Sequence, residues 1–173
     1  MKERCLLGLK LVGVALVLSM GVMVNAAEPN NVGGIFKEKG VDWLFGKWEA
    51  VTDANEKATA NFLLEMDGYV LSLDAKVGER YSYQGIVFYV PSKGVLVNSG
   101  IDTRGVALSG TWEIEGDKLV LKGEQTTADG QVFRFVRYLS KADANTMKAT
   151  TYRIIDGKLS DEPGTMEFKR VKN

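Results

Sequence analysis

The stretch Val106-Ala-Leu-Ser-Gly-Thr-Trp-Glu-Ile114 alternates apolar with small or polar residues. Successive side chains of a β-strand point to opposite faces, so Leu108 and Trp112 share one face and the polar residues share the other. After a Gly-Asp turn, residues 118–124 repeat the pattern, and Leu119 and Leu121 lie on one face. This hairpin predicts a sheet that buries one side and exposes the other.

The same alternation of strands and turns continues on both sides of this hairpin. The turn signals are Asp53-Ala-Asn, Met66-Asp-Gly, Gly78-Glu-Arg, Pro91-Ser-Lys-Gly, Ile101-Asp-Thr-Arg-Gly, Glu115-Gly-Asp, Ala128-Asp-Gly, Asp143-Ala-Asn and Ile155-Asp-Gly-Lys. They separate about ten strands, and short turns make neighbouring strands antiparallel. An even number of strands allows the first to pair with the last. The sequence therefore predicts an all-β fold, an antiparallel up-and-down β-barrel with a short N-terminal helix, between Ile35 and Phe45, capping one end.

An export signal is predicted at the N-terminus. Basic residues precede an apolar run from Leu11 to Val24, and Val24-Asn25-Ala26 fits the small-residue pattern of a cleavage site. The run is shorter than the roughly 20 apolar residues of a membrane-spanning helix. An uncleaved anchor is the alternative interpretation.

Cleavage after Ala26 divides the chain into a signal peptide at 1–26, a flexible lead at 27–40 and a barrel domain at 41–173. We expect the mature protein to be exported to the periplasm or the extracellular space. The single cysteine, Cys5, lies in the signal, so no disulfide is expected in the mature chain. The sequence holds 22 basic and 22 acidic residues without a basic block, so neither nucleic acid nor an anionic membrane surface is a predicted partner.

Four segments resemble a family of bacterial lipocalin-like proteins without assigned function. They are Trp43-Leu-Phe-Gly-Lys-Trp48, Tyr83-Gln-Gly85, Gly110-Thr-Trp112 and Phe168-Lys-Arg-Val171. In the wider superfamily of lipocalins and fatty-acid-binding proteins, a Gly-x-Trp begins the first strand and a late arginine packs over the tryptophan. Gly46, Trp48 and Arg170 are similar to that pattern, and the resemblance spans Val41 to Lys172. It implies a closed barrel with an interior that holds a small molecule.

The proposed closure also follows from strand pairing. If the first and last strands pair antiparallel, Trp48 near the start of one lies beside Arg170 near the end of the other. Both side chains point inward by alternation, so the guanidinium stacks on the indole. Such a contact stabilises by about 0.5–2 kcal/mol, depending on burial. We therefore assign Gly46, Trp48 and Arg170 a structural role.

Missing residue types exclude several kinds of chemistry. The chain has no histidine, which removes Ser-His-Asp triads and histidine-ligated metal sites. Without a mature cysteine, thiolate metal sites and redox thiols are excluded as well. No glycine-rich nucleotide motif follows a strand and opens a helix. The sequence therefore predicts no catalytic residue, no metal site and no cofactor.

Candidate ligand-binding residues come from inward positions. Alternation from Met147 turns Arg153 inward, and a tight hairpin to the last strand places it near Met166. An inward arginine needs an anion, so a bound carboxylate or phosphate is one interpretation; an internal ion pair or a position at the wet rim are the others. Arg137, whose neighbour Arg134 lies on the opposite face, is a second inward candidate. Tyrosines including Tyr83 and Tyr89 are candidates for the cavity wall, or for the core.

Three functional hypotheses follow. The favoured one is an exported barrel that binds a small apolar, amphipathic or anionic ligand in its interior. The alternative is a packed-barrel structural or protein-interaction module of the cell envelope with no small ligand. An enzyme that uses carboxylates or tyrosines at the barrel mouth is the third, and no motif supports it. The first hypothesis predicts an open interior and the second a filled one.

Overall fold

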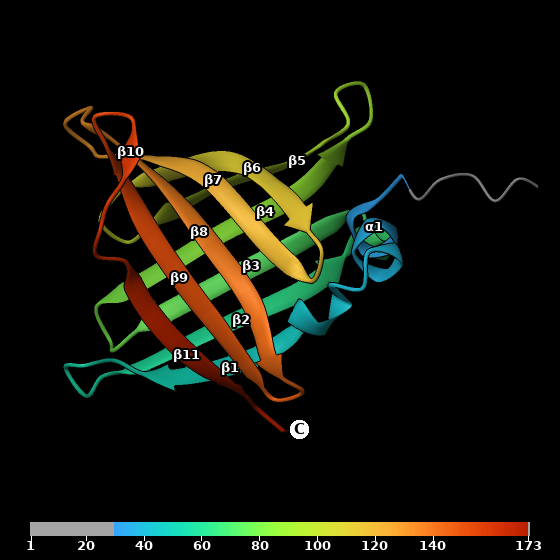
Figure 1. Ribbon diagram of the computed structural model, residues 1–173, viewed down its shortest axis with the longest axis horizontal. Coiled ribbons are helices and arrows are strands. Elements are labelled where there is room, and N and C mark those ends of the chain that lie inside the picture. The colour runs from blue at the N-terminus through green and yellow to red at the C-terminus, as the bar shows by residue number, and fades with distance from the viewer. Residues whose placement is uncertain (1–29, 173) are drawn as a thin grey trace, which may run out of the picture.

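The computed structural model describes residues 30–172, which form a closed antiparallel β-barrel with a short helix at one end (Figure 1). Ten strands build the barrel, as the sequence predicted, and an eleventh, two-residue strand pairs with the end of one of them. The predicted signal peptide lies outside the described residues.

The barrel is an up-and-down meander in which each strand pairs with the next. Its strands are β1 (Gly46–Val51), β2 (Lys57–Glu65), β3 (Val70–Val77), β4 (Tyr81–Val90), β5 (Val95–Asp102), β6 (Ala107–Glu115), β7 (Lys118–Thr126), β8 (Val132–Asp143), β9 (Thr146–Ile155) and β11 (Gly164–Arg170). A single 3₁₀ turn, η2 (Met66–Gly68), joins β2 to β3. The two-residue β10 (Lys158–Leu159) pairs with the end of β9, and the chain then continues into β11. Because every barrel strand has two neighbours, no long edge is left unpaired.

Pairing of β1 with β11 closes the barrel, and Trp48 lies directly opposite Arg170. The Arg170 guanidinium lies 4.1 Å from the centre of the Trp48 ring. It donates one hydrogen bond to the carbonyl oxygen of Phe45 at 2.8 Å and another to that of Trp43. Gly46 has a φ of +113°, and a side chain there would lie 3.1 Å from the arginine. The predicted closure is therefore present. The position of the Arg170 side chain and the positive φ explain why residue 46 is a glycine.

The N-terminal helix differs in position from the sequence expectation. Helix α1 spans Val32–Glu38, inside the segment expected to be a flexible lead, and a separate 3₁₀ turn, η1, spans Asp42–Leu44. The helix begins early because Asn31 caps it by accepting a hydrogen bond from the Gly34 amide at 2.7 Å. It ends before Gly40, whose φ of +69° is incompatible with helix continuation.

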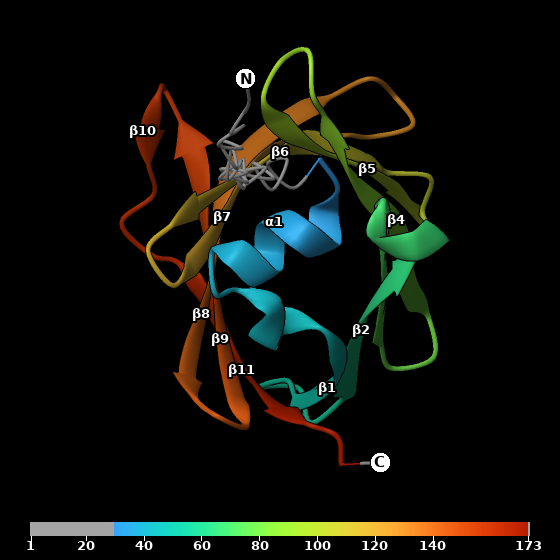
Figure 2. The ribbon, with the colours of Figure 1, turned by 90° about the vertical axis from the view of Figure 1, so that its right-hand side faces the viewer.

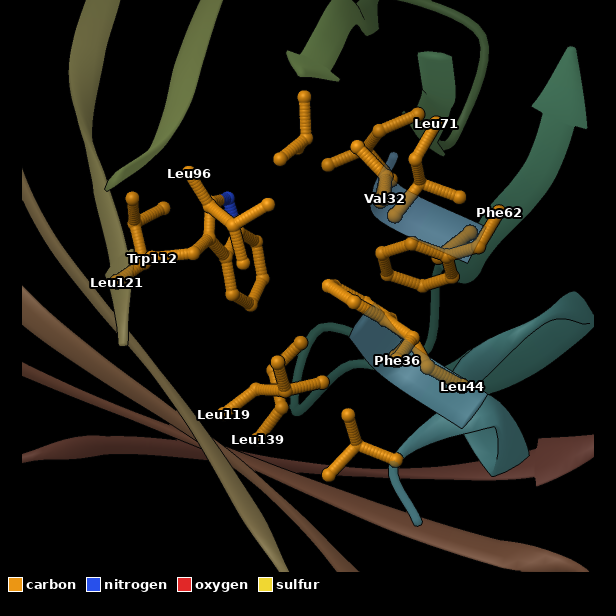
Figure 3. Close-up of a cluster of buried hydrophobic side chains, with 14 of the residues drawn as sticks. Val32, Phe36, Leu44, Phe62, Leu71, Leu96, Trp112, Leu119, Leu121 and Leu139 are labelled. Atoms are coloured by element: carbon orange, nitrogen blue, oxygen red, sulfur yellow. The ribbon is translucent and has the colours of Figure 1, made fainter. Parts of the chain in front are cut away.

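Helix α1 lies across one opening of the barrel (Figure 2). Its buried residues Val32 and Phe36, with Leu44 of η1, extend into the interior and pack on the strands. Figure 3 shows this cluster, in which the helix side chains face Phe62 and Leu71 of the barrel wall. The core is therefore concentrated at the α1 end, and the interior at the other end is less filled.

Candidate ligand-binding cavity

A cavity of about 380 Å³ lies in the half of the barrel away from α1. On one side, β2, β3, β9 and β11 contribute small residues, Ala58, Ala60, Ala75, Ala149 and Gly164, next to larger ones such as Phe62 and Phe168. The opposite wall carries large side chains from β4, β5, β6 and β8: Tyr81, Tyr83, Asn98, Trp112 and Arg137. The space exists because the small side chains do not reach across the barrel to meet the large ones.

Among the described residues, the cavity is lined by two charged side chains, Arg137 and the exposed Lys76. Arg137 lies opposite Thr151 on β9 and Leu121 on β7, midway along the barrel. Its Nε–H donates to the Thr151 hydroxyl at 3.0 Å, and its guanidinium lies 5.5 Å from the centre of the Phe135 ring. Protein surrounds the group, and the surface that remains accessible faces the cavity.

No carboxylate among the described residues compensates the charge of Arg137. None of the described residues lining the cavity is Asp or Glu, and Arg137 takes part in no ion pair within residues 30–172. Burial lowers the pKa of Arg137, because a charged group is poorly solvated inside the protein. An arginine nevertheless stays protonated at neutral pH. The cavity therefore contains an uncompensated positive charge whose Nη groups have no partner among the described residues.

Tyr83 faces the same cavity and is held in place by its neighbours. Its hydroxyl accepts a hydrogen bond from the Asn98 side chain at 3.3 Å, and Asn98 accepts one from the Trp112 indole at 3.2 Å. Gly85 and Gly100, paired on β4 and β5, lie directly beneath the phenol. A Cβ atom built on either glycine would lie 2.2 or 2.3 Å from the Tyr83 oxygen. These glycines therefore create the space that Tyr83 occupies.

The rim of the cavity includes Tyr81, which is covered by Arg104 at 5.1 Å from its ring centre. Asp102 fixes Arg104 through an ion pair at 2.5 Å and also accepts hydrogen bonds from the amides of Arg104 and Val106. Burial opposes the charge of Asp102, but the bonds from Arg104 and Val106 outweigh it and hold its pKa below the usual value. This carboxylate is shielded by its own loop and organises the β5–β6 turn.

The structure separates the four candidate residues of the sequence analysis. Arg137 and Tyr83 line the cavity, whereas Tyr89 packs against the core beyond it. Arg153 is exposed and contributes to a shallow surface hollow beside Phe133.

The expected position of Arg153 near Met166 is wrong, because Met166 pairs with Ala149 instead. The inference assumed a tight hairpin between β9 and the last strand. The chain inserts β10 there and enters β11 only at Gly164, which pairs with Thr151. Arg153 therefore extends past the paired part of β11, at the rim.

Two contributors to the cavity were not identified from the sequence. Asn98 lies between Leu96 and Gly100 at an inward position of β5, and it is only 1% exposed. A polar residue at an inward position was the available clue. Thr151 shares the alternation of Met147 and Arg153, but its hydrogen bond to Arg137 depends on the β8–β9 register, which the sequence does not give.

The sequence matches no protein-family model, and it is not similar to any of the curated proteins with which it was compared. Within residues 30–172, no group of three or more acidic side chains is arranged to hold a metal ion. No helix in this part of the chain has the length and hydropathy needed to cross a membrane. Evidence about function therefore comes from the cavity itself.

Proposed function

We propose that this protein is an exported, lipocalin-like binding protein that holds a small anionic amphiphile inside its barrel. The observation that carries the proposal is the Arg137 guanidinium, which faces a mostly apolar cavity without a carboxylate partner among the described residues. An unpaired charge inside a protein is costly, and a bound anion compensates it. The surrounding apolar wall accommodates the rest of an amphipathic molecule.

The charge of the cavity favours a ligand with one negative charge. Thr151 occupies the Nε–H of Arg137, which leaves the two Nη groups to donate a pair of parallel hydrogen bonds. A carboxylate matches this geometry and this charge. Lys76, the other charged residue of the lining, is exposed, so a doubly charged phosphate would leave one negative charge without a buried partner.

The volume of the cavity limits the size of the ligand. A cavity of about 380 Å³ lies at the lower end of the range of small-molecule pockets, roughly 300–1,000 Å³, so it accommodates a small ligand. The wall on the α1 side is occupied by core side chains, so a longer ligand would extend past the rim. A medium-chain carboxylate such as decanoate is a suitable probe of this size. The cavity also favours the binding hypothesis over a barrel packed with its own side chains.

Two features of the sequence support the remaining parts of the proposal. The basic, apolar and small-residue pattern of residues 1–26 supports export through a signal peptide. The Gly46–Trp48–Arg170 closure and the ten-stranded meander support a relationship with lipocalin-like barrels. Such a barrel at the cell surface or in the periplasm would carry or sequester its ligand.

The proposal is tested by extracting the native ligand. The protein is exported from its own host, purified without detergent and denatured in organic solvent, and the extract is analysed by mass spectrometry. An Arg137→Gln variant and a matched Arg153→Gln variant are prepared in the same way. Both lose one arginine, but only the first loses it from the cavity.

We expect a stoichiometric anionic amphiphile in the wild-type and Arg153→Gln extracts, and its loss from Arg137→Gln. Equal retention by all three proteins would show that Arg137 is not the anchor. Repeated empty extracts, with no thermal shift on addition of decanoate or other medium-chain carboxylates, would reject the binding proposal.

A further inference from the structure

Three buried polar side chains form a chain of hydrogen bonds in the cavity wall. Trp112 donates to Asn98, and Asn98 donates to the hydroxyl of Tyr83. Their exposed fractions are 4%, 1% and 7%, so water does not replace any of these partners. The chain runs across three strands, β6, β5 and β4, and ends at the cavity surface.

The direction of each hydrogen bond in this chain is fixed by the chemistry of its first member. An indole N–H only donates, so the side chain of Asn98 must turn its oxygen toward Trp112. The amide NH₂ of Asn98 then faces Tyr83, and it too only donates. The Tyr83 oxygen must therefore accept this bond, and its own hydrogen points elsewhere.

The Tyr83 hydroxyl hydrogen has no acceptor among residues 30–172. The phenol lies against Gly85 and Gly100, which restricts its rotation, and its oxygen borders the cavity. Burial raises the pKa of Tyr83, so the hydroxyl remains protonated at neutral pH. Tyr83 is therefore a directed donor that requires an acceptor inside the cavity.

We propose that Tyr83 and Arg137 together form a two-point site for a carboxylate, in which Asn98 is a positioning residue that aims the Tyr83 O–H at the ligand. This inference rests on the proposed binding function and adds its chemical selectivity. Three N–H or O–H groups converge on the ligand head, two from Arg137 and one from Tyr83. Such a site favours a head group that only accepts hydrogen bonds over an alcohol of the same length, which also presents a donor and lacks the charge.

The decisive variant is Asn98→Asp, which keeps the shape of the side chain. Its carboxylate still accepts from Trp112 but also accepts from Tyr83, so the Tyr83 O–H turns away from the cavity. Binding of decanoate and of decan-1-ol is measured by titration, with Trp112 fluorescence as one readout and calorimetry as another. For the wild type we expect decanoate to bind at least tenfold more tightly than decan-1-ol, since a charge-assisted hydrogen bond changes affinity by about a factor of ten or more. For Asn98→Asp we expect this preference to fall at least tenfold.

The new negative charge of Asn98→Asp would also weaken decanoate binding by itself. A Tyr83→Phe variant keeps the ring above the glycines and removes only the hydroxyl, so Asn98→Asp is repeated in that background. If Asn98 acts by aiming the hydroxyl, the substitution lowers the decanoate preference by a smaller factor when the hydroxyl is absent. An equal factor in both backgrounds would overturn the positioning role of Asn98.

Thermal unfolding and circular dichroism establish that each variant is folded, and Tyr83→Phe alone gives a second test. It should lower decanoate affinity about tenfold while leaving decan-1-ol affinity within about threefold. An unchanged decanoate preference in Tyr83→Phe would overturn the two-point site and leave the proposed binding function intact. Failure of the wild type to bind either probe would reject the binding function and this inference together.

Discussion

The two ends of the barrel use partly buried arginines in opposite ways. At the closed end, Arg170 stacks on Trp48 and donates to two backbone carbonyls. Toward the open end, Arg137 has one hydroxyl partner, Thr151, and lies over the ring of Phe135. The comparison shows that burial of an arginine does not identify a ligand site. The number of its hydrogen-bond donors that the fold satisfies is the informative quantity.

The two halves of the barrel interior also differ in how completely side chains fill them. Small residues leave space on one side, and the polar chain of Trp112, Asn98 and Tyr83 ends in an unused donor on the other. At the α1 end the corresponding space is filled by Phe36 and Leu44. The α1 half is therefore filled with apolar side chains, and the other half retains polar groups that face a cavity.

The largest expected effect is on Arg170→Leu at the closed end. Two backbone carbonyl oxygens lose their donor and the Trp48 ring loses its stacked partner, so we expect the free energy of unfolding to fall by about 3 kcal/mol. Urea denaturation of the variant and the wild type measures this loss of unfolding free energy. The surface variant Arg134→Leu is the control and should change the value by under about 0.5 kcal/mol. A loss as small as that of the control would show that closure does not depend on Arg170.

The next largest effect is expected for Gly100→Ala in the wall of the open half. A Cβ atom there would lie 2.3 Å from the Tyr83 oxygen and 2.5 Å from the backbone oxygen of Gln84. We expect a loss of about 2 kcal/mol in unfolding free energy and displacement of Tyr83. Gly164→Ala, where no atom lies within 4 Å of the added carbon, is the matched control and should cost little. Equal losses in the two variants would contradict the packing explanation.

Much of this architecture could be predicted from the sequence. Alternation and turn residues identified ten strands, because these depend on local periodicity. The contact between Trp48 and Arg170 was predicted from the resemblance to lipocalin-like barrels and from pairing the first strand with the last. The α1 boundary was displaced because the Asn31 cap lies before the apolar pattern begins. The position of Arg153 was wrong because β10 lengthens the connection to β11.

The residues that line the cavity were harder to predict from the sequence. Arg137 and Tyr83 were among the candidates, but alternation neither assigned the faces of their strands nor ranked them above Arg153, since depth along the axis depends on the register of non-local pairs. The role of Asn98 depends on hydrogen bonds between residues 14 and 15 positions apart. Such contacts follow from the assembled barrel and not from any one strand.

A smaller effect is expected for Arg137→Leu. Replacing an uncompensated buried charge by an apolar side chain of similar length should leave the unfolding free energy unchanged or raise it by about 1 kcal/mol. The measurement is urea denaturation of ligand-free protein, side by side with Arg170→Leu. A loss as large as that of Arg170→Leu would mean that Arg137 is a structural residue, and the comparison between the two ends would fail.

The smallest effect concerns acid stability at the rim. The pKa of Asp102 is lowered in the folded protein: burial opposes this, but the hydrogen bond from Arg104 and the Val106 and Arg104 amides outweigh it. A carboxylate with a lowered folded pKa stabilises the protein above its unfolded pKa, near 3.8, and this contribution is lost as the pH falls through the lowered value. Asp102→Asn should therefore show a flatter decline of unfolding free energy below about pH 4. The decline that remains comes in part from Asp129 and Asp143, whose pKa values are lowered by the Thr127 hydroxyl and the Asn145 amide. Urea denaturation at pH 7 and at pH 3 measures this decline for the wild type and the variant, and an equal decline in the two proteins would show that Asp102 has no share in acid unfolding.

The ion pair between Asp102 and Arg104 lies outside the cavity, so the decanoate preference at pH 7 should be the same in Asp102→Asn as in the wild type. A changed preference would extend the binding site to the rim and move the boundary between the two halves of the barrel.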